Sequence, residues 1–345
     1  METILRALFL LTSLYFVLVN GQVYDVLDFG AKGDGTSDDS EINGKIVAPI
    51  NKSAWSNYKK LIWIDFTDII GLAINGSGTI DGRGSSFWKP FLTASRRPTQ
   101  LHFERCDNLS IIGITSLNSP KNHISISQSN NVYISRIKLF APEDSPNTDG
   151  IDISRSSVVN IVDTMIGTGD DCVALNNGSV NININRMNCG PGHGISVGSL
   201  GRDGEKSTVE NVLVTNCTFN RTDNGARIKT WPNGKGYAKN IIFKGIKLIE
   251  AKNPIIINQK YVDKGRLNVE KSAVAISNVT FRDISGTSRG DEIVKLDCSE
   301  VTYCKDIVLE QIDISTSDGN KPLFECSNVY GKSSNASAVQ GCFAK

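Results

Sequence analysis

A short apolar pattern recurs along most of the chain, with large apolar residues at positions n, n+2 and n+5. Because alternate side chains of a strand point to one face, the n/n+2 spacing predicts β-strands. Repeats of this length indicate stacked units, none of which can bury its apolar face alone. The copies are separated by 23 to 38 residues, the one at Val159 is weaker than the rest, and they begin at Leu109, Val132, Val159, Ile182, Val212, Ile241, Val279 and Ile307.

The content of each unit selects among repeat architectures. One strand triplet without an amphipathic helix excludes ankyrin, tetratricopeptide and leucine-rich designs, and most intervals are too short for the four strands of a propeller blade. The remaining interpretation is an all-β fold, a parallel β-helix or solenoid in which each repeat of roughly 25 residues forms one coil. Neighbouring coils then stack about 4.8 Å apart. An irregular β-sandwich is the alternative.

The N-terminal segment predicts secretion. Arg6 precedes the mostly apolar run Ala7–Val19, and small residues at Val19 and Gly21 suit a cleavage site. Residues 1–21 are therefore predicted to be a signal peptide rather than a buried strand, and 22–345 a single catalytic domain. The run is too short to span a membrane, and no later stretch reaches the necessary length. With 37 basic and 36 acidic side chains, the composition points to neither nucleic-acid nor membrane partners.

Eight cysteines agree with an oxidising compartment. Proximity suggests the disulfides Cys172–Cys189, Cys298–Cys304 and Cys326–Cys342, although eight cysteines allow 105 connectivities. Cys106 and Cys217 are left over and are interpreted as buried thiols. The chain is also expected to be a glycoprotein, since N-x-S/T sequons occur at Asn51, Asn75, Asn108, Asn177, Asn216, Asn220, Asn278 and Asn335.

Reactive side chains recur at about the interval of the coil. In a solenoid, residues one repeat apart lie above one another, so these residues should occupy about five adjacent rungs within roughly 20 Å. The segments are N-T-D-G at 147–150, G-D-D-C at 169–172, G-H-G at 192–194 and R-I-K at 227–229, and they carry Asp149, Asp170, Asp171, His193, Arg227 and Lys229, followed by Tyr261.

Such a column suits glycosidic bond cleavage. Adjacent carboxylates repel, so at least one pKa should rise and one group stay protonated beside an ionised base. Arg227 and Lys229 could neutralise an anionic sugar. Each motif alone has a plainer interpretation: a turn at 147–150, a surface histidine at His193, solvent-facing charge on Arg227 and Lys229, or calcium ligation by Asp170 and Asp171.

At these four motifs the chain resembles the polygalacturonases, the pectin-degrading glycoside hydrolases. The likeness extends from Val23-Tyr24-Asp25-Val26, through the segment 28–35, to the C-terminus, and it is strongest to the plant members. The resemblance implies a right-handed parallel β-helix that needs no metal or cofactor. It also implies inverting hydrolysis of α-1,4 bonds between galacturonic acids in homogalacturonan, by a secreted monomer acting in the cell wall.

The resemblance also implies a role for each residue. Asp170 would be the general acid, while Asp149 and Asp171 would hold and activate the attacking water. His193 would tune the protonation of the acid or orient its neighbours. The remaining residues would bind substrate or support the site: Arg227 and Lys229 the sugar carboxylate, Tyr261 the sugar beside the scissile bond, Asn147 the carboxylates, and the Cys172–Cys189 bridge the turn that carries the acid.

One departure from the family pattern concerns the N-terminal end. Asp38-Asp39-Ser40 runs almost at once into Asn43-Gly44-Lys45, where family members continue through an amphipathic helix. Roughly sixty residues are missing by this comparison, and the lost helix would cap the open end of the β-helix. The alternatives are therefore an inactive or truncated pectin-binding wall protein, a hydrolase of another pectic domain such as rhamnogalacturonan, or a calcium-dependent pectate lyase.

Overall fold

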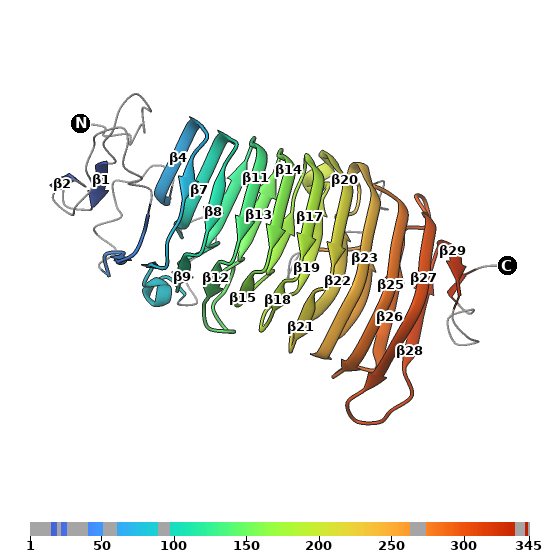
Figure 1. The fold of residues 1–345 in the computed structure, drawn as a ribbon. Helices are drawn as coiled ribbons and strands as arrows, with labels where there is room; N and C mark the ends of the chain where they lie inside the picture. Colours follow the sequence, from blue (N-terminus) through green and yellow to red (C-terminus); the bar gives the residue numbers. More distant parts are fainter. Residues whose placement is uncertain are drawn as a thin grey trace.

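The computed structural model is a right-handed parallel β-helix, as the repeat predicts. It describes residues 15–18, 22–25, 41–50, 61–88, 97–262, 274–334 and 342–343. Figure 1 shows the coils following one another along a single axis from β4 to β27. The helices of these residues are two short 3₁₀ turns, η3 (Gly84–Ser86) and η5 (Arg202–Gly204). None of them is long and apolar enough to cross a membrane.

One wall of the solenoid is a ten-stranded sheet whose neighbouring strands are all parallel. In spatial order the strands are β28 (Leu323–Ser327), β26 (Glu292–Asp297), β24 (Asn253–Asn258), β22 (Asn224–Thr230), β19 (Ile195–Leu200), β16 (Val173–Leu175), β13 (Ile151–Ser154), β10 (Ile124–Ser127), β7 (Thr99–Asp107) and β4 (Ile62–Ile70).

The remaining walls form a 17-stranded sheet. Early coils contribute two short strands each, whereas three late coils contribute one long strand each: β23 (Lys235–Ala251), β25 (Ala275–Ser288) and β27 (Cys304–Thr316). The other members are β3 (Lys45–Val47), β5 (Ala73–Ile74), β6 (Thr79–Asp81), β8 (Ser110–Ile112), β9 (Thr115–Leu117), β11 (Asn130–Ser135), β12 (Lys138–Phe140), β14 (Ser157–Val162), β15 (Met165–Gly167), β17 (Ser179–Asn185), β18 (Asn188–Cys189), β20 (Lys206–Thr215), β21 (Thr218–Asn220) and β29 (Val329–Ser333).

The apolar triplets of the sequence stack in register. Val132 pairs with Val159, Val159 with Ile182, and Ile182 with Val212. The column continues through Ile241, Val279 and Ile307, and all of these side chains are buried. Aromatic rings stack in the same way, with the Phe243 and Phe281 centroids 5.6 Å apart. The core is therefore a set of aligned apolar columns, each of which fixes the register of its neighbours.

Asparagines mark one corner of the coil. Asn181, Asn211, Asn240 and Asn278 all adopt positive φ between 51° and 58°, a region that asparagine enters more readily than most residues. Their amides form a ladder: Asn211 donates to Asn181 at 2.9 Å, Asn240 to Asn211 at 3.0 Å, and Asn278 to Asn240 at 2.9 Å. Because successive coils turn at the same point, loops at other corners also stay in phase.

The N-terminal coil is joined by part of the shortened segment. Glu41 bridges to Asn75, and β3 pairs with β6 in parallel. The edge strand of the ten-stranded sheet is β4, where Ile70 is 75% exposed. Among the residues that the structure describes, no α-helix covers this edge.

A separate antiparallel pair, β1 (Tyr15–Leu18) and β2 (Gln22–Asp25), precedes the solenoid. The rest of the predicted signal peptide lies outside the described residues, so the cleavage remains a prediction.

All three predicted disulfides are present: Cys172–Cys189, Cys298–Cys304 and Cys326–Cys342. Cys106 and Cys217 are buried free thiols. Burial raises the pKa of both thiols to about 11, so they are unreactive core groups rather than nucleophiles. Four sequon asparagines are exposed, namely Asn108, Asn216, Asn220 and Asn278, whereas Asn51 and Asn335 lie outside the described residues.

Candidate active site

The motif residues gather on five adjacent rungs, as predicted. They lie on, or at the end of, β13, β16, β19, β22 and β24, which are consecutive in the ten-stranded sheet. Backbone hydrogen bonds stack the turns that carry them. Gly150 N donates to the Asp171 carbonyl at 2.8 Å, and His193 N donates to the Asp170 carbonyl at 2.7 Å. Residues up to 114 positions apart in sequence, Asn147 and Tyr261, therefore form one site, without help from long loops.

These residues line a pocket of about 190 Å³, which we call the active-site pocket. Predicted members are Asn147, Asp149, Asp170, Asp171, Lys229 and Tyr261. Sequence reasoning missed the others, which are Asp152, Ala174, Asn176, Gly198 and Ser199. His193 and Arg227 lie beside the pocket, where they contact Asp170 and Asp171 respectively.

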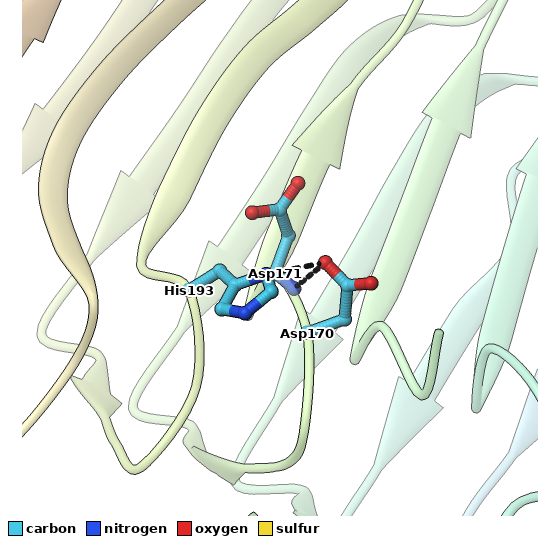
Figure 2. Close-up of side chains that lie close together, drawn as sticks. All are labelled: Asp170, Asp171 and His193. Atoms are coloured by element: carbon cyan, nitrogen blue, oxygen red, sulfur yellow. Dashed lines mark hydrogen bonds and ion pairs between the residues drawn. The ribbon is translucent and has the colours of Figure 1, made fainter. Parts of the chain in front are cut away.

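Asp170 and His193 form a hydrogen-bonded pair (Figure 2). His193 Nδ1 lies 2.8 Å from Asp170 Oδ1, which also accepts from the backbone N–H of Asp171 at 2.9 Å. Burial acts to lower the pKa of His193, but the hydrogen bond to Asp170 and the charges of Asp170 and Asp171 outweigh it, so the pKa is raised. The other ring nitrogen lies 3.5 Å from Asp223 Oδ2. The pair therefore retains a proton above the usual range of an imidazole.

Asp171 points away from this pair (Figure 2). Two cationic side chains contact its carboxylate. The residue is 1% exposed. Arg227 Nη2 and Ser196 Oγ donate to its Oδ1, and Lys229 Nζ donates to its Oδ2 at 2.8 Å. Burial acts to raise the pKa of Asp171, but Arg227 and Lys229 outweigh it and lower the pKa to about 2. Asp171 is thus ionised at any working pH.

Asp149 and Asp152 show the opposite shift. Burial, reinforced by the charges of Asp170, Asp152 and Asp171, raises the pKa of Asp149 well above its usual value. Burial raises the pKa of Asp152 to about 7, although the charge of Lys121 opposes the change. Asp152 Oδ2 accepts from Asn122, whereas its Oδ1 has no partner among the described residues. The direction of the shift at Asp149 is the one expected for crowded carboxyl groups, and Asp152 adds a second carboxyl with a raised pKa.

The two cations predicted to bind substrate have a partner within the protein. Arg227 and Lys229 both engage Asp171. The Lys229 ammonium also lies 5.3 Å from the centroid of the Tyr261 ring, which makes an edge contact with Trp231. Because Lys229 and Tyr261 both line the pocket, a sugar carboxylate could reach this cation while Asp171 holds it in place.

The geometry argues against the calcium interpretation of Asp170 and Asp171. One donor atom from each of Asp170, Asp171 and His193 lies within 4.8 Å of the others. Both oxygens of Asp171 already accept from cationic side chains, and His193 is held by Asp170. A divalent cation here would have to displace Arg227 and Lys229.

Asp152 could have been found in the sequence. It alternates with the buried Ile151 and Ile153, and it therefore points outward from β13, three residues after Asp149. Its register partners define an outer row across the sheet, which runs Asp65, His102, Ser125, Asp152, Ala174, Ser196, Arg227, Ile256, Lys295 and Glu325.

A parallel β-helix that gathers carboxyl groups of unequal protonation in an outward pocket defines a polysaccharide-cleaving hydrolase. Residues 29–338 match the family described as glycosyl hydrolases family 28, and the chain belongs to that family. Among relatives, a probable polygalacturonase of Arabidopsis thaliana is 43% identical over 94% of this chain and 82% of that protein. A polygalacturonase of Persea americana is 39% identical over 84% of this chain and 64% of that protein.

Solved structures agree on the fold. An endo-xylogalacturonan hydrolase from Aspergillus tubingensis is 27% identical with a TM-score of 0.76, covering 86% of this chain and 85% of that one. An exopolygalacturonase from Thermotoga maritima is 21% identical with a TM-score of 0.71, covering 86% and 78%.

The alignment with the Arabidopsis protein also bears on the missing segment. It spans 378 positions, although 94% of this chain is only about 324 residues. About 54 positions therefore have no counterpart here, a number close to the loss expected from the family pattern.

Proposed function

We propose that this protein is a secreted polygalacturonase that hydrolyses α-1,4 bonds between galacturonosyl residues of homogalacturonan, with inversion of configuration. The observation that carries the proposal is the pocket itself. Three motif carboxyl groups and a lysine line it and a histidine lies beside it, with the pKa of Asp171 lowered to about 2 and the pKa values of Asp149 and His193 raised. The relatives named above support the pectic substrate. We expect the protein to act as a monomer in the cell wall.

Each residue then has a role in the reaction. Asp170 delivers a proton to the glycosidic oxygen as the bond to the anomeric carbon breaks, and His193, 2.8 Å away, supplies the proton that the pair holds. Asp149 and Asp171 position a water molecule for attack from the opposite face, and Asp171, the ionised carboxylate of the two, takes its proton. Lys229 and Arg227 bind the sugar carboxylate, and Tyr261 contacts the adjoining sugar ring.

The test is release of reducing ends from polygalacturonate by the wild type and by Asp170→Asn. We expect the substitution to lower kcat by at least a hundredfold, because an amide cannot protonate the leaving oxygen. NMR of the first product should show the inverted anomer. Folded wild-type protein that releases no more reducing ends than Asp170→Asn would overturn the proposal and favour an inactive pectin-binding protein.

Two further measurements separate the enzyme alternatives. Cleavage that persists in a chelator and forms no unsaturated ends excludes a calcium-dependent lyase. Faster cleavage of rhamnogalacturonan than of polygalacturonate would assign the site to another pectic domain.

A further inference from the structure

An arginine outside every motif lies against the active-site loop. Arg97 precedes β7 by two residues and is only 4% exposed. Its Nη1 donates to the carbonyl of Pro146, and its Nη2 donates to Asn147 Oδ1 at 2.6 Å. This guanidinium should stay close to the loop that carries Asn147, because a buried charge that loses its hydrogen-bond partners is energetically costly.

Arg97 determines which way the Asn147 amide faces. A guanidinium can only donate, so it requires the oxygen of that amide. The amide nitrogen is thereby turned toward Asp170, and Asn147 Nδ2 lies 3.3 Å from Asp170 Oδ2. Asp170 Oδ1 faces His193 instead. The two oxygens of Asp170 are thus held from opposite sides, one through His193 and one through Arg97 and Asn147.

Arg97 also adds a fixed positive charge to the side of the pocket that lacks Arg227 and Lys229. Burial lowers the pKa of Arg97, and the charges of Asp170 and Asp149 oppose that change. An arginine nevertheless remains protonated in proteins. Its charge attracts the two carboxylates that face the acid and water positions.

We propose that Arg97 is a positioning residue for hydrolysis, which acts through Asn147 to orient the carboxyl group of Asp170. The proposal rests on the proposed function, in which Asp170 delivers the proton. Misdirecting a catalytic group by about 1 Å can cost on the order of a hundredfold in rate. Arg97 is buried and does not line the active-site pocket, so we expect the effect to fall on kcat rather than on KM.

The experiment is a double-mutant cycle of Arg97→Met and Asn147→Ala on polygalacturonate. We expect Arg97→Met to lower kcat about tenfold to a hundredfold and to change KM less than threefold. In the Asn147→Ala background it should cost less than threefold more, because the path through Asn147 is already broken. Arg97→Lys keeps the charge and one donor direction, and it should recover part of the loss. Arg105→Met, which removes an exposed arginine of β7, is the matched control and should leave kcat unchanged.

A second readout requires no turnover. The titration of His193, followed by NMR of its ring, should shift to lower pH in Arg97→Met, because a misoriented Asp170 stabilises the imidazolium less. If the wild type cleaves nothing while the His193 titration still shifts in Arg97→Met, the proposed function fails, but the orientation of Asp170 by Arg97 stands. Additive losses in the cycle, or an unchanged His193 titration in both Arg97 variants, would overturn the role of Arg97.

Discussion

Aspartates on two sides of the active-site pocket have pKa values that are shifted in opposite directions. On the cationic side, Asp171 receives three side-chain donors and its pKa falls to about 2. On the acid side, Asp152 receives one donor and its pKa rises to about 7, while no described side chain donates to the carboxylate of Asp149, whose pKa also rises. Burial acts to raise the pKa on both sides, so the donors decide which carboxyl is ionised.

This difference suggests how a solenoid can prepare an acid and a base from identical residues. The fold delivers aspartates to neighbouring rungs about 4.8 Å apart. The side chains on neighbouring strands then determine the protonation state. Arg227 and Lys229 are on β22, two strands beyond the rung of Asp171, whereas the register partners of Asp152 are the uncharged Ser125 on β10 and Ala174 on β16.

The largest expected effect comes from removing a cation with Lys229→Met. Asp171 would remain buried with less compensation, and breaking a buried ion pair from one side typically costs about 3–5 kcal/mol of unfolding free energy. We also expect kcat/KM to fall at least a hundredfold, because the pKa of Asp171 would rise and a smaller fraction of it would be ionised at working pH. Urea unfolding and reducing-end release measure the two effects.

A second substitution identifies the cause of the instability. Adding Asp171→Asn to Lys229→Met removes the unpaired carboxylate, so stability should return toward wild type while activity stays low. Lys239→Met, at an exposed pair with Glu210 on the other sheet, is the control and should change neither property. If the double variant loses as much unfolding free energy as the two single variants together, the ion pairs of Asp171 do not stabilise the cationic side.

The next substitution, Asp152→Asn on the acid side, should stabilise the protein at neutral pH rather than destabilise it. The pKa of Asp152 is about 7 in the folded protein, compared with its ordinary value of 3.8. The native state therefore binds the extra proton, and wild-type stability should fall as pH rises from about 4 to 7, by up to about 4 kcal/mol. Asparagine keeps the acceptor for Asn122 but cannot ionise, so the variant should lose this slope and be more stable than wild type at pH 7.

Urea unfolding at several pH values between 4 and 8 checks this expectation. Asp163→Asn, in an exposed pair with Arg186 whose aspartate has a lowered pKa, provides the contrast. Its stability profile should show no such gain at neutral pH. A wild type whose stability is flat across this range would mean that Asp152 is ionised in the native state, and the two sides of the pocket would then be alike.

Most of the fold was predictable from the sequence because stacking is periodic. The starts Val132, Val159, Ile182 and Val212 pair with one another as the spacing indicates. The merging of two strands into β23 was not predicted, since the same triplet fits two short strands or one bent one. The ten-stranded sheet left its own signal in alternations such as Ile124/Ile126 and Val173/Leu175, which were too short to interpret without the coil around them.

The site was predictable to the extent that it depends on how far apart the residues lie in sequence, relative to the length of one coil. Asp149, Asp170 and His193 meet because each lies about one coil from the next. The partners of Arg227 and Lys229 were not predictable, since spacing places side chains on one face but does not say whether a cation binds a sugar or Asp171. Arg97 left no signal, because it belongs to no repeated motif and reaches Asn147 across 50 positions of sequence.

The smallest effect tests whether the donors on the cationic side act in proportion to their number. Ser196 Oγ donates to Asp171 Oδ1 at 2.9 Å and accepts from Arg227 Nε at 2.7 Å, so Ser196→Ala removes one donor and leaves both cations. We expect a loss of about 1 kcal/mol of unfolding free energy and less than tenfold in kcat/KM. The lowered pKa of Asp171 stabilises the fold above pH 3.8 and ceases to do so as pH falls toward 2, so the variant should lose stability at a slightly higher pH than wild type. Acid unfolding measures that midpoint, and a loss as large as that of Lys229→Met would show that Arg227 depends on Ser196 for its placement rather than acting as an independent cation.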